Sequence, residues 1–170
     1  DSEVMPMRNT ARYAALLVML ALALSLLSAC GKSSSVADVP VEELAQKVDE
    51  AIGNDGTLIA VDADYIKGYM RMDVSDYVGF VVKINAYGAN IDEYGIFKGA
   101  DEKQAKEIAK AVEDYLQLRE DTWMEEYMPE EKPKLLAAEY KVLGNYVMYA
   151  ILWDEEKAAA FDAFTSALSK

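Results

Sequence analysis

An apolar run near the start of the chain separates a leader from the part that can fold as a domain. Tyr13–Leu27 contains no charged residue, follows Arg8 and Arg12, and ends at two small residues and the only cysteine of the chain. A positive start, an apolar core of about 7–15 residues and a small-residue cleavage site make up a secretory leader. A membrane-spanning helix, the alternative, needs about 20 apolar residues. We therefore expect the leader to be cleaved.

The end of this run, Leu27-Ser28-Ala29-Cys30, is typical of a lipobox, the motif at which bacterial lipoprotein precursors are lipidated and cut. We expect residues 1–29 to be a signal peptide, which its peptidase recognises through Leu27, Ser28 and Ala29. Cys30 then carries a two-chain lipid, and stable anchoring takes more than one acyl chain. The motif thus predicts a protein held at the cell membrane, on the extracytoplasmic face, through a lipid on Cys30.

The first six residues fit this leader poorly. Asp1 and Glu3 oppose its positive charge, and Met7 is the better start for a signal peptide. We therefore expect the leader to begin at Met7 and residues 1–6 to play no part in the fold.

Composition excludes several classes of function. With 17 Lys and Arg against 30 Asp and Glu, the net charge is −13, which phosphate backbones repel, so nucleic acid is not an expected partner. The chain has no histidine, and Cys30 is its single cysteine. Hydrolytic triads built on histidine and conventional zinc sites are therefore excluded. We expect no cofactor, no metal and no disulfide, and an enzyme is the less favoured class.

The remaining chain divides into a tether and one domain. Residues 30–39 are interpreted as the lipidated cysteine and a flexible tether, because Gly31 to Asp38 are mostly small and polar. Residues 40–170 are interpreted as a single domain, long enough for one hydrophobic core.

Hydrophobic periodicity predicts an α+β fold for this domain, with the order α-α-β-β-α-β-β-α after the signal-peptide helix. The predicted helices span residues 40–52, 63–72, 101–127 and 154–168. The predicted strands span residues 77–84, 93–98, 139–143 and 146–153, with a further short strand possible over 57–61. The strands form two hairpins, the second closed by Gly144-Asn145. We expect an antiparallel sheet of about four strands with the helices packed on one face.

Two of the predicted helices have clear buried faces. In the long helix, Asp101 is the expected N-cap, and the apolar stripe runs from Ile108 to Trp123 and includes Arg119. The last helix is expected to bury Ala158, Phe161, Phe164 and Leu168.

Aromatic residues are the candidates for ligand contact. Tyr87 and Tyr94 flank a loop rich in Gly and Asn, where their rings can stack on a sugar or a peptide. For Tyr87 a structural role is equally compatible with the pattern. Four further aromatic residues are expected in the core or at its rim: Trp123, Tyr140, Tyr149 and Trp153.

Charged residues give no convincing catalytic or metal site. Asp55, Asp62 and Asp64 lack the spacing of a calcium loop, so we expect one of them to cap a helix. Glu93 and Lys98 lie on one strand and face opposite sides, and we expect both to be solvated residues of an edge strand. The carboxylate pairs that a glycosidase would need are Asp73 with Asp76 and Glu120 with Asp121. A chain with 30 acids contains such pairs by chance.

Two segments carry a family resemblance: Asp92–Lys98, which reads DEYGIFK, and Gly144–Ile151, which reads GNYVMYAI. With the lipobox, the long charged helix and the Pro-containing loop, they resemble the small lipobox-containing proteins of Gram-positive bacteria known as domain of unknown function 4358. The resemblance covers about residues 40–168. It implies extracytoplasmic placement, no established activity and no catalytic residue.

The sequence therefore favours a membrane-anchored, non-catalytic binding or accessory domain that acts on a cell-envelope protein or polysaccharide. The alternatives are a carboxylate-dependent enzyme acting on envelope glycans and a structural spacer. A deep pocket lined by convergent acids would favour the enzyme, an exposed aromatic patch would favour binding, and a featureless acidic surface would favour the spacer.

Overall fold

The computed structural model describes residues 36–170. The predicted signal peptide, the lipobox residues Leu27, Ser28, Ala29 and Cys30, and most of the predicted tether lie outside the described residues. Among the residues that are described, no helix is long and apolar enough to cross a membrane.

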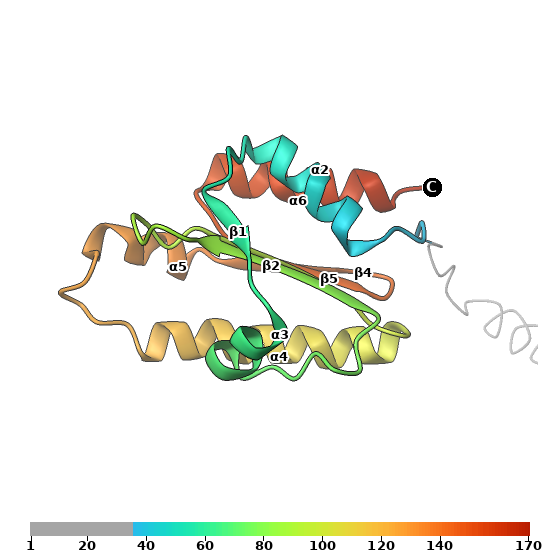
Figure 1. The fold of residues 1–170 in the computed structure, drawn as a ribbon, viewed down its shortest axis with the longest axis horizontal. Helices are drawn as coiled ribbons and strands as arrows, with labels where there is room; N and C mark the ends of the chain where they lie inside the picture. The colour runs from blue at the N-terminus through green and yellow to red at the C-terminus, as the bar shows by residue number, and fades with distance from the viewer. Residues whose placement is uncertain (1–35) are drawn as a thin grey trace, which may run out of the picture. The chain divides into compact units, whose positions relative to one another are not determined.

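One sheet of five antiparallel strands lies at the centre of the domain, in the order β1-β2-β3-β5-β4 (Figure 1). The strands are β1 (Leu58–Ala60), β2 (Gly79–Asn85), β3 (Glu93–Lys98), β4 (Glu139–Leu143) and β5 (Tyr146–Ile151). The predicted α+β class and both predicted hairpins are confirmed. The short strand considered over residues 57–61 forms as β1 and pairs with β2, which makes the sheet five strands wide.

Helices cover both faces of this sheet, so the expectation that they pack on one face is wrong (Figure 1). The helical segments are α2 (Val41–Ile52), α3 (Ala63–Tyr65), the π-helix η2 (Ile66–Met70), α4 (Glu102–Asp121), the 3₁₀ turn η3 (Pro129–Glu131), α5 (Lys132–Leu136) and α6 (Asp154–Leu168). α2 and α6 lie on one face, and α4 and η2 lie on the other. The physical reason is that β3 and β5 are buried on both sides, and such strands need a covering layer on each face.

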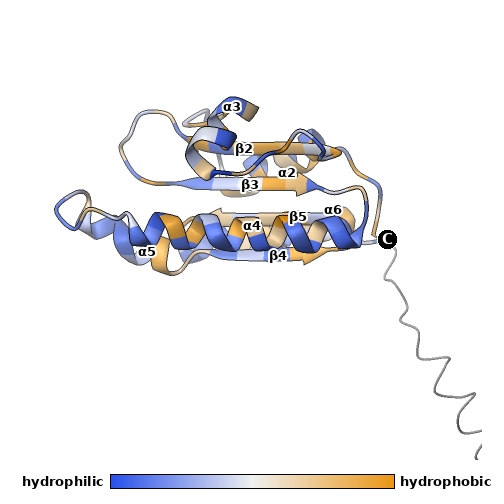
Figure 2. Cartoon of the chain, turned by 90° about the horizontal axis from the view of Figure 1, so that it is seen from below, coloured by the Kyte–Doolittle hydropathy of each residue, from blue (hydrophilic) through white to orange (hydrophobic). Residues whose placement is uncertain are grey.

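Each face has its own apolar core. Phe97 and Tyr149 point toward α4 and η2, whereas Tyr94 and Met148 point toward α2 and α6. Figure 2 shows the pattern that this arrangement imposes on α4, in which hydrophobic and hydrophilic stretches alternate along the helix.

The last helix, α6, buries Phe161, Phe164 and Leu168 as predicted, but Ala158 is exposed. Lys157 and Ala160 are buried in its place. The ammonium group of Lys157 donates a hydrogen bond of 2.5 Å to the carbonyl of Ala137. Lys157 can therefore be buried where the periodicity predicted Ala158, because its aliphatic stem is apolar and its ammonium group is hydrogen-bonded.

Helix α4 begins as predicted, because the Asp101 carboxylate accepts a hydrogen bond of 2.8 Å from the backbone N–H of Gln104. It ends at Asp121, well before the predicted end at residue 127. The residues beyond it form a loop in which Met128 has φ of 47°. η3 and α5 follow, where only a Pro-containing loop was expected.

Residues 36–39, which we call the N-terminal segment, are held against the domain although the sequence assigned them to the tether. The backbone N–H of Ala37 bonds the carbonyl of Leu168, and the Tyr146 hydroxyl bonds both polar backbone groups of Val39. Asp38 forms an ion pair with Lys98, which lowers the pKa of Asp38 through a hydrogen bond and its charge. Residues 36–39 therefore pack as part of the domain.

Candidate functional site

A cavity of about 280 Å³ lies on the α4 face of the sheet, at the end where β3 begins. We call it the Arg119 pocket. Its aromatic lining consists of Tyr65, Tyr69, Trp123 and Tyr127. Its polar lining includes Asn85, Asn90, Asp92, Glu93 and Arg119. The pocket thus combines rings from α3, η2 and the loop after α4 with polar groups from β2, β3, α4 and the β2–β3 loop.

The short helical segment α3–η2 brings two of these rings together. Asp62 caps it by accepting a hydrogen bond of 2.8 Å from the N–H of Tyr65, so the capping role predicted for one of the three aspartates is confirmed. Tyr65 and Tyr69 stack with their ring centroids 5.2 Å apart. The segment ends at Arg71, whose φ of 59° is left-handed. π-Helical turns are rare and occur often at functional sites.

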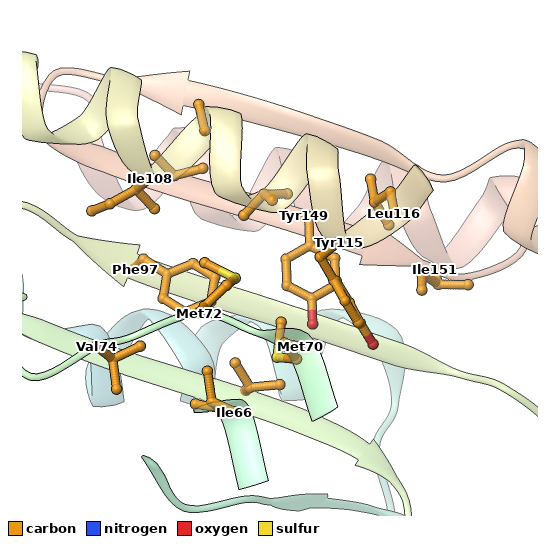
Figure 3. Packing of buried hydrophobic residues seen from close by; sticks show 14 of the residues in the cluster. Ile66, Met70, Met72, Val74, Phe97, Ile108, Tyr115, Leu116, Tyr149 and Ile151 are labelled. Carbon is orange, nitrogen blue, oxygen red and sulfur yellow. The ribbon is translucent and has the colours of Figure 1, made fainter. Parts of the chain in front are cut away.

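Glu93 forms the floor of the pocket, and its side chain is almost fully buried. One carboxylate oxygen accepts hydrogen bonds from the hydroxyls of Tyr115, at 2.7 Å, and Tyr149, and the other accepts from Arg119 at 2.8 Å. Figure 3 shows the two tyrosine rings side by side, reaching into the core from α4 and β5. The expectation that Glu93 is a solvated edge residue is therefore wrong, because β3 lies between β2 and β5.

Arg119 brings a fixed positive charge to the pocket wall. Its Nη1 atom donates to both Glu93 and the Tyr115 hydroxyl at 2.8 Å. The guanidinium lies 5.7 Å from the ring centroid of Tyr69 and 5.8 Å from that of Tyr115, within cation–π range. Burial disfavours the charged guanidinium, but the carboxylate of Glu93 together with the hydroxyls of Tyr115 and Tyr69 outweighs this effect and raises the pKa of Arg119.

The same surroundings hold the neighbouring phenols in their neutral form. Burial first, and the negative charge of Glu93 second, raise the pKa of Tyr65 to about 12. The same two causes raise the pKa of Tyr115 and of Tyr149 still further. The phenols around Glu93 therefore act as hydrogen-bond donors across the physiological pH range.

A second ionic cluster fixes the loop beside the pocket. Lys134 of α5 is 1 % exposed and pairs with Asp92 and Glu131, each at 2.5 Å. Glu131 also accepts a hydrogen bond of 3.1 Å from the N–H of Ile91. Asp92 is thus paired with a buried lysine, so both acids that line the pocket are already engaged by the protein.

Large apolar side chains surround the mouth of the pocket. Tyr69, Met124 and Tyr127 are all about half exposed or more, and all three line the cavity. Exposed apolar side chains that gather at a cavity mark binding surfaces more often than scattered ones do.

The two tyrosines proposed from the sequence as ligand contacts lie in different places. Tyr87 is 75 % exposed, in the turn whose Asn85 and Asn90 line the pocket. Tyr94 is fully buried on the opposite face of the sheet, where its hydroxyl donates a hydrogen bond of 2.8 Å to Asp49. The structure therefore does not bring these two rings onto one surface.

The other candidates lie away from the pocket floor. Lys98 is at the opposite end of β3, paired with Asp38 and largely buried, so the prediction of a solvated Lys98 is wrong as well. Asp73 is paired with Lys67, and Asp76 accepts a hydrogen bond from Gln104. Within residues 36–170 no three Asp, Glu, His or Cys side chains gather in a metal-binding arrangement.

Of the four aromatic residues expected in the core or at its rim, Tyr149 is fully buried and Trp123 is partly buried. Tyr140 and Trp153 are rim residues, each a little under half exposed.

Sequence reasoning missed most of the Arg119 pocket. Tyr65 and Tyr69 lie in the helix predicted over residues 63–72, and Tyr127 lies at the end of the helix predicted over residues 101–127. Neither pattern marks these rings as ligand contacts. One signal was available, because Arg119 interrupts an otherwise apolar stripe. An arginine on the buried side of a helix needs a buried acceptor, and Glu93 is that acceptor.

The fold and the pocket define the class: an α+β domain with a five-stranded antiparallel sheet between two helical layers and an aromatic-lined pocket at one end. Residues 50–152, more than half of the chain, match the family described as Domain of unknown function (DUF4358), and the chain belongs to this family. The matched region contains every residue that lines the Arg119 pocket. Comparison with curated proteins and with solved structures found no match.

Proposed function

We propose that this chain is a lipid-anchored, extracytoplasmic binding domain that holds part of a cell-envelope protein or polymer in the Arg119 pocket. The observation that carries the proposal is the contrast between the acids and the rings of this pocket. Both oxygens of Glu93 are bonded by the protein, and Asp92 is paired with Lys134. Tyr69 and Tyr127, by comparison, present about half of their surface to solvent.

This contrast favours binding over catalysis. A general acid or base has to exchange a proton with its substrate from within hydrogen-bond reach. Both oxygens of Glu93 are instead occupied by three donors of the protein, which suits a role in positioning Arg119. A carboxylate-dependent enzyme is therefore the weaker alternative. A structural spacer is also weaker, because it has no need of a pocket surrounded by exposed apolar side chains.

The anchored location rests on the lipobox at Cys30. The net charge of −13 supports a domain that is repelled by an anionic membrane surface and is held near it by the lipid alone. The expected partner is a component of the envelope within reach of such an anchor.

Site-specific photo-crosslinking in intact cells tests the proposal. The full-length chain carries a photo-reactive amino acid in place of Tyr127 at the pocket mouth. We expect a discrete adduct that a second substitution, Tyr69→Ala, strongly reduces. The matched control places the photo-reactive residue at Tyr140, which is 42 % exposed on the edge strand β4. Equal adducts from both positions, or none from position 127, would contradict the proposed function.

A further inference from the structure

We infer that the Arg119 pocket takes a neutral sugar ring of an envelope polysaccharide. This inference rests on the proposed binding function and names the ligand class for the same pocket. It follows from the size of the cavity, its aromatic lining, its unused hydrogen-bonding groups and its charge.

The size of the pocket limits the ligand to a compact group. Pockets for drug-sized ligands have volumes of roughly 300–1,000 Å³, and the Arg119 pocket, at about 280 Å³, falls just below that range. A single ring fits such a volume, whereas a folded peptide segment does not.

The aromatic lining suits the faces of a sugar ring. Tyr65 and Tyr69 stack on each other, and Trp123 and Tyr127 lie on the wall formed by the loop after α4. The face of an aromatic ring carries partial negative charge, so it attracts the slightly positive C–H groups on the face of a sugar. Tyr65 and the guanidinium of Arg119 pack against part of the Tyr69 ring. About half of the surface of Tyr69 and of Tyr127 remains exposed and can make this contact.

The polar lining offers both donors and acceptors, which is what hydroxyl groups need. Among the described residues, no acceptor bonds Nε or Nη2 of Arg119, since its hydrogen bonds are all made by Nη1. The Asn90 side chain accepts two hydrogen bonds through its oxygen, while its amide N–H groups have no protein acceptor within residues 36–170. Asp92 pairs with Lys134 through one oxygen, which leaves its other oxygen as an acceptor.

One buried donor in the pocket wall also lacks a partner. The indole nitrogen of Trp123 is shielded from water and has no acceptor among the described residues. Leaving a buried donor unsatisfied is unfavourable. A ligand oxygen that enters the pocket can remove this cost if the indole turns toward it.

Charge selects a neutral ligand over an ionic one. Arg119 is neutralised by Glu93, and Lys134 faces two carboxylates, those of Asp92 and Glu131. The pocket therefore has a small negative excess within a domain of net charge −13, which disfavours a phosphate or carboxylate ligand. A cationic ligand would lie against the guanidinium of Arg119.

A binding titration with the full-length protein in detergent micelles tests the inference. The probes are soluble polysaccharide fragments from the envelope of the native host, separated by ion exchange into a neutral and an anionic fraction. The readouts are tryptophan fluorescence, because Trp123 lines the pocket, and retention of the protein on the immobilised fraction. We expect the neutral fraction to bind and the anionic fraction not to bind.

Three variants connect this binding to the pocket. Tyr69→Ala should weaken binding at least tenfold, whereas Tyr69→Phe should retain it because the ring is kept. Tyr140→Ala, which removes a comparably exposed ring on β4, should bind like the wild type. Circular dichroism of each variant checks that it is folded.

Binding of the anionic fraction alone, binding of neither fraction, or neutral binding that folded Tyr69→Ala leaves unchanged would overturn the inference. These results are distinguishable from failure of the proposed function. If the crosslink from position 127 persists and yields a protein adduct that depends on Tyr69, the pocket is a binding site for another ligand class. If that crosslink is also absent, both proposals fail.

Discussion

At the scale of single residues, Glu93 and Arg119 form a buried ion pair at the floor of the pocket. Both side chains are largely removed from water, and two tyrosine hydroxyls complete the hydrogen bonding of the carboxylate. A buried charge is tolerated only when its partners are in place. The cluster therefore depends on α4, β3 and β5 packing together, and its integrity reports on the packing of the pocket floor.

Replacement of Glu93 by glutamine should be strongly destabilising. Removing one member of a buried ion pair leaves an uncompensated charge and costs roughly 3–5 kcal/mol. We expect Glu93→Gln to lower the free energy of unfolding by about 3 kcal/mol, measured by urea denaturation. Glu113→Gln removes an exposed carboxylate from the same helix that carries Arg119, and should change the free energy by less than about 0.5 kcal/mol. Equal stabilities of the two variants would contradict this assignment.

Because several phenols are buried, we expect the protein to lose stability at alkaline pH. Tyrosine in an unfolded chain ionises near pH 10, whereas burial and the charge of Glu93 raise the pKa of Tyr65 to about 12 and that of Tyr115 and Tyr149 further. The folded state therefore keeps protons that the unfolded state releases. The stabilisation is complete below about pH 10 and declines as the pH rises above it. With no histidine in the chain, we expect little change between pH 6 and 9.

Urea denaturation at pH 8 and pH 11 measures this decline. In Tyr149→Phe one buried phenol is absent, so the difference in unfolding free energy between the two pH values should be smaller than in the wild type. A wild-type protein as stable at pH 11 as at pH 8 would refute the prediction.

At the scale of elements, the central strand β3 shows how closely the layers are packed. A Cβ atom added at Gly95 would lie 2.3 Å from a ring carbon of Tyr149 on the neighbouring strand. The glycine thus gives the tyrosine ring the space that it needs to reach Glu93. A larger residue would force the ring away from the carboxylate.

Gly95→Ala should therefore destabilise the protein by about 1–3 kcal/mol, the usual cost of overpacking a core. The matched control is Gly68→Ala in η2, where an added Cβ meets no atom within 4 Å. Alanine is favoured over glycine in a helix by about 0.5–1 kcal/mol, so the control should be neutral or slightly stabilising. Thermal unfolding of both variants measures this difference in stability. If Gly95→Ala were as stable as the wild type, the Tyr149 ring would be free to move away, which would contradict the prediction.

Local features of the elements were predictable from the sequence. The alternation of apolar and polar residues predicted β2 and β3. The Gly144-Asn145 turn predicted the second hairpin, and Asp101 predicted the start of α4. Each depends on residues that are neighbours in the chain. Gly144 has φ of 57°, the conformation that the first position of a type II′ turn requires.

The order of strands was not predictable in the same way, and the pocket depends on it. β5 pairs with β3 although α4, η3, α5 and β4 lie between them in the chain. This long-range pairing makes β3 central, buries Glu93 and divides the helices between two faces. The uninterrupted apolar character of Tyr146–Ile151 was the available sign that this strand is covered on both sides.

At the scale of the whole molecule, the proposed lipid anchor depends on one atom, the sulfur of Cys30. Cys30→Ala removes the sulfur that would carry the lipid, so we expect metabolic labelling with palmitate to be lost and the leader to remain uncleaved. Ser33→Ala, a neighbouring change that leaves the lipobox intact, should label and mature normally. Normal labelling of Cys30→Ala would contradict the lipoprotein assignment.

The hydrogen bonds of the N-terminal segment have a consequence for where the pocket can operate. They fasten Val36–Val39 to the end of the sheet that carries Lys98 and Tyr146, whereas the Arg119 pocket lies at the end where β3 begins. The chain therefore enters the domain at the opposite end of β3 from the pocket, roughly 20 Å away. A ligand bound in the Arg119 pocket and an anchor attached before residue 36 would then act at separate ends of the domain, so that neither blocks the other.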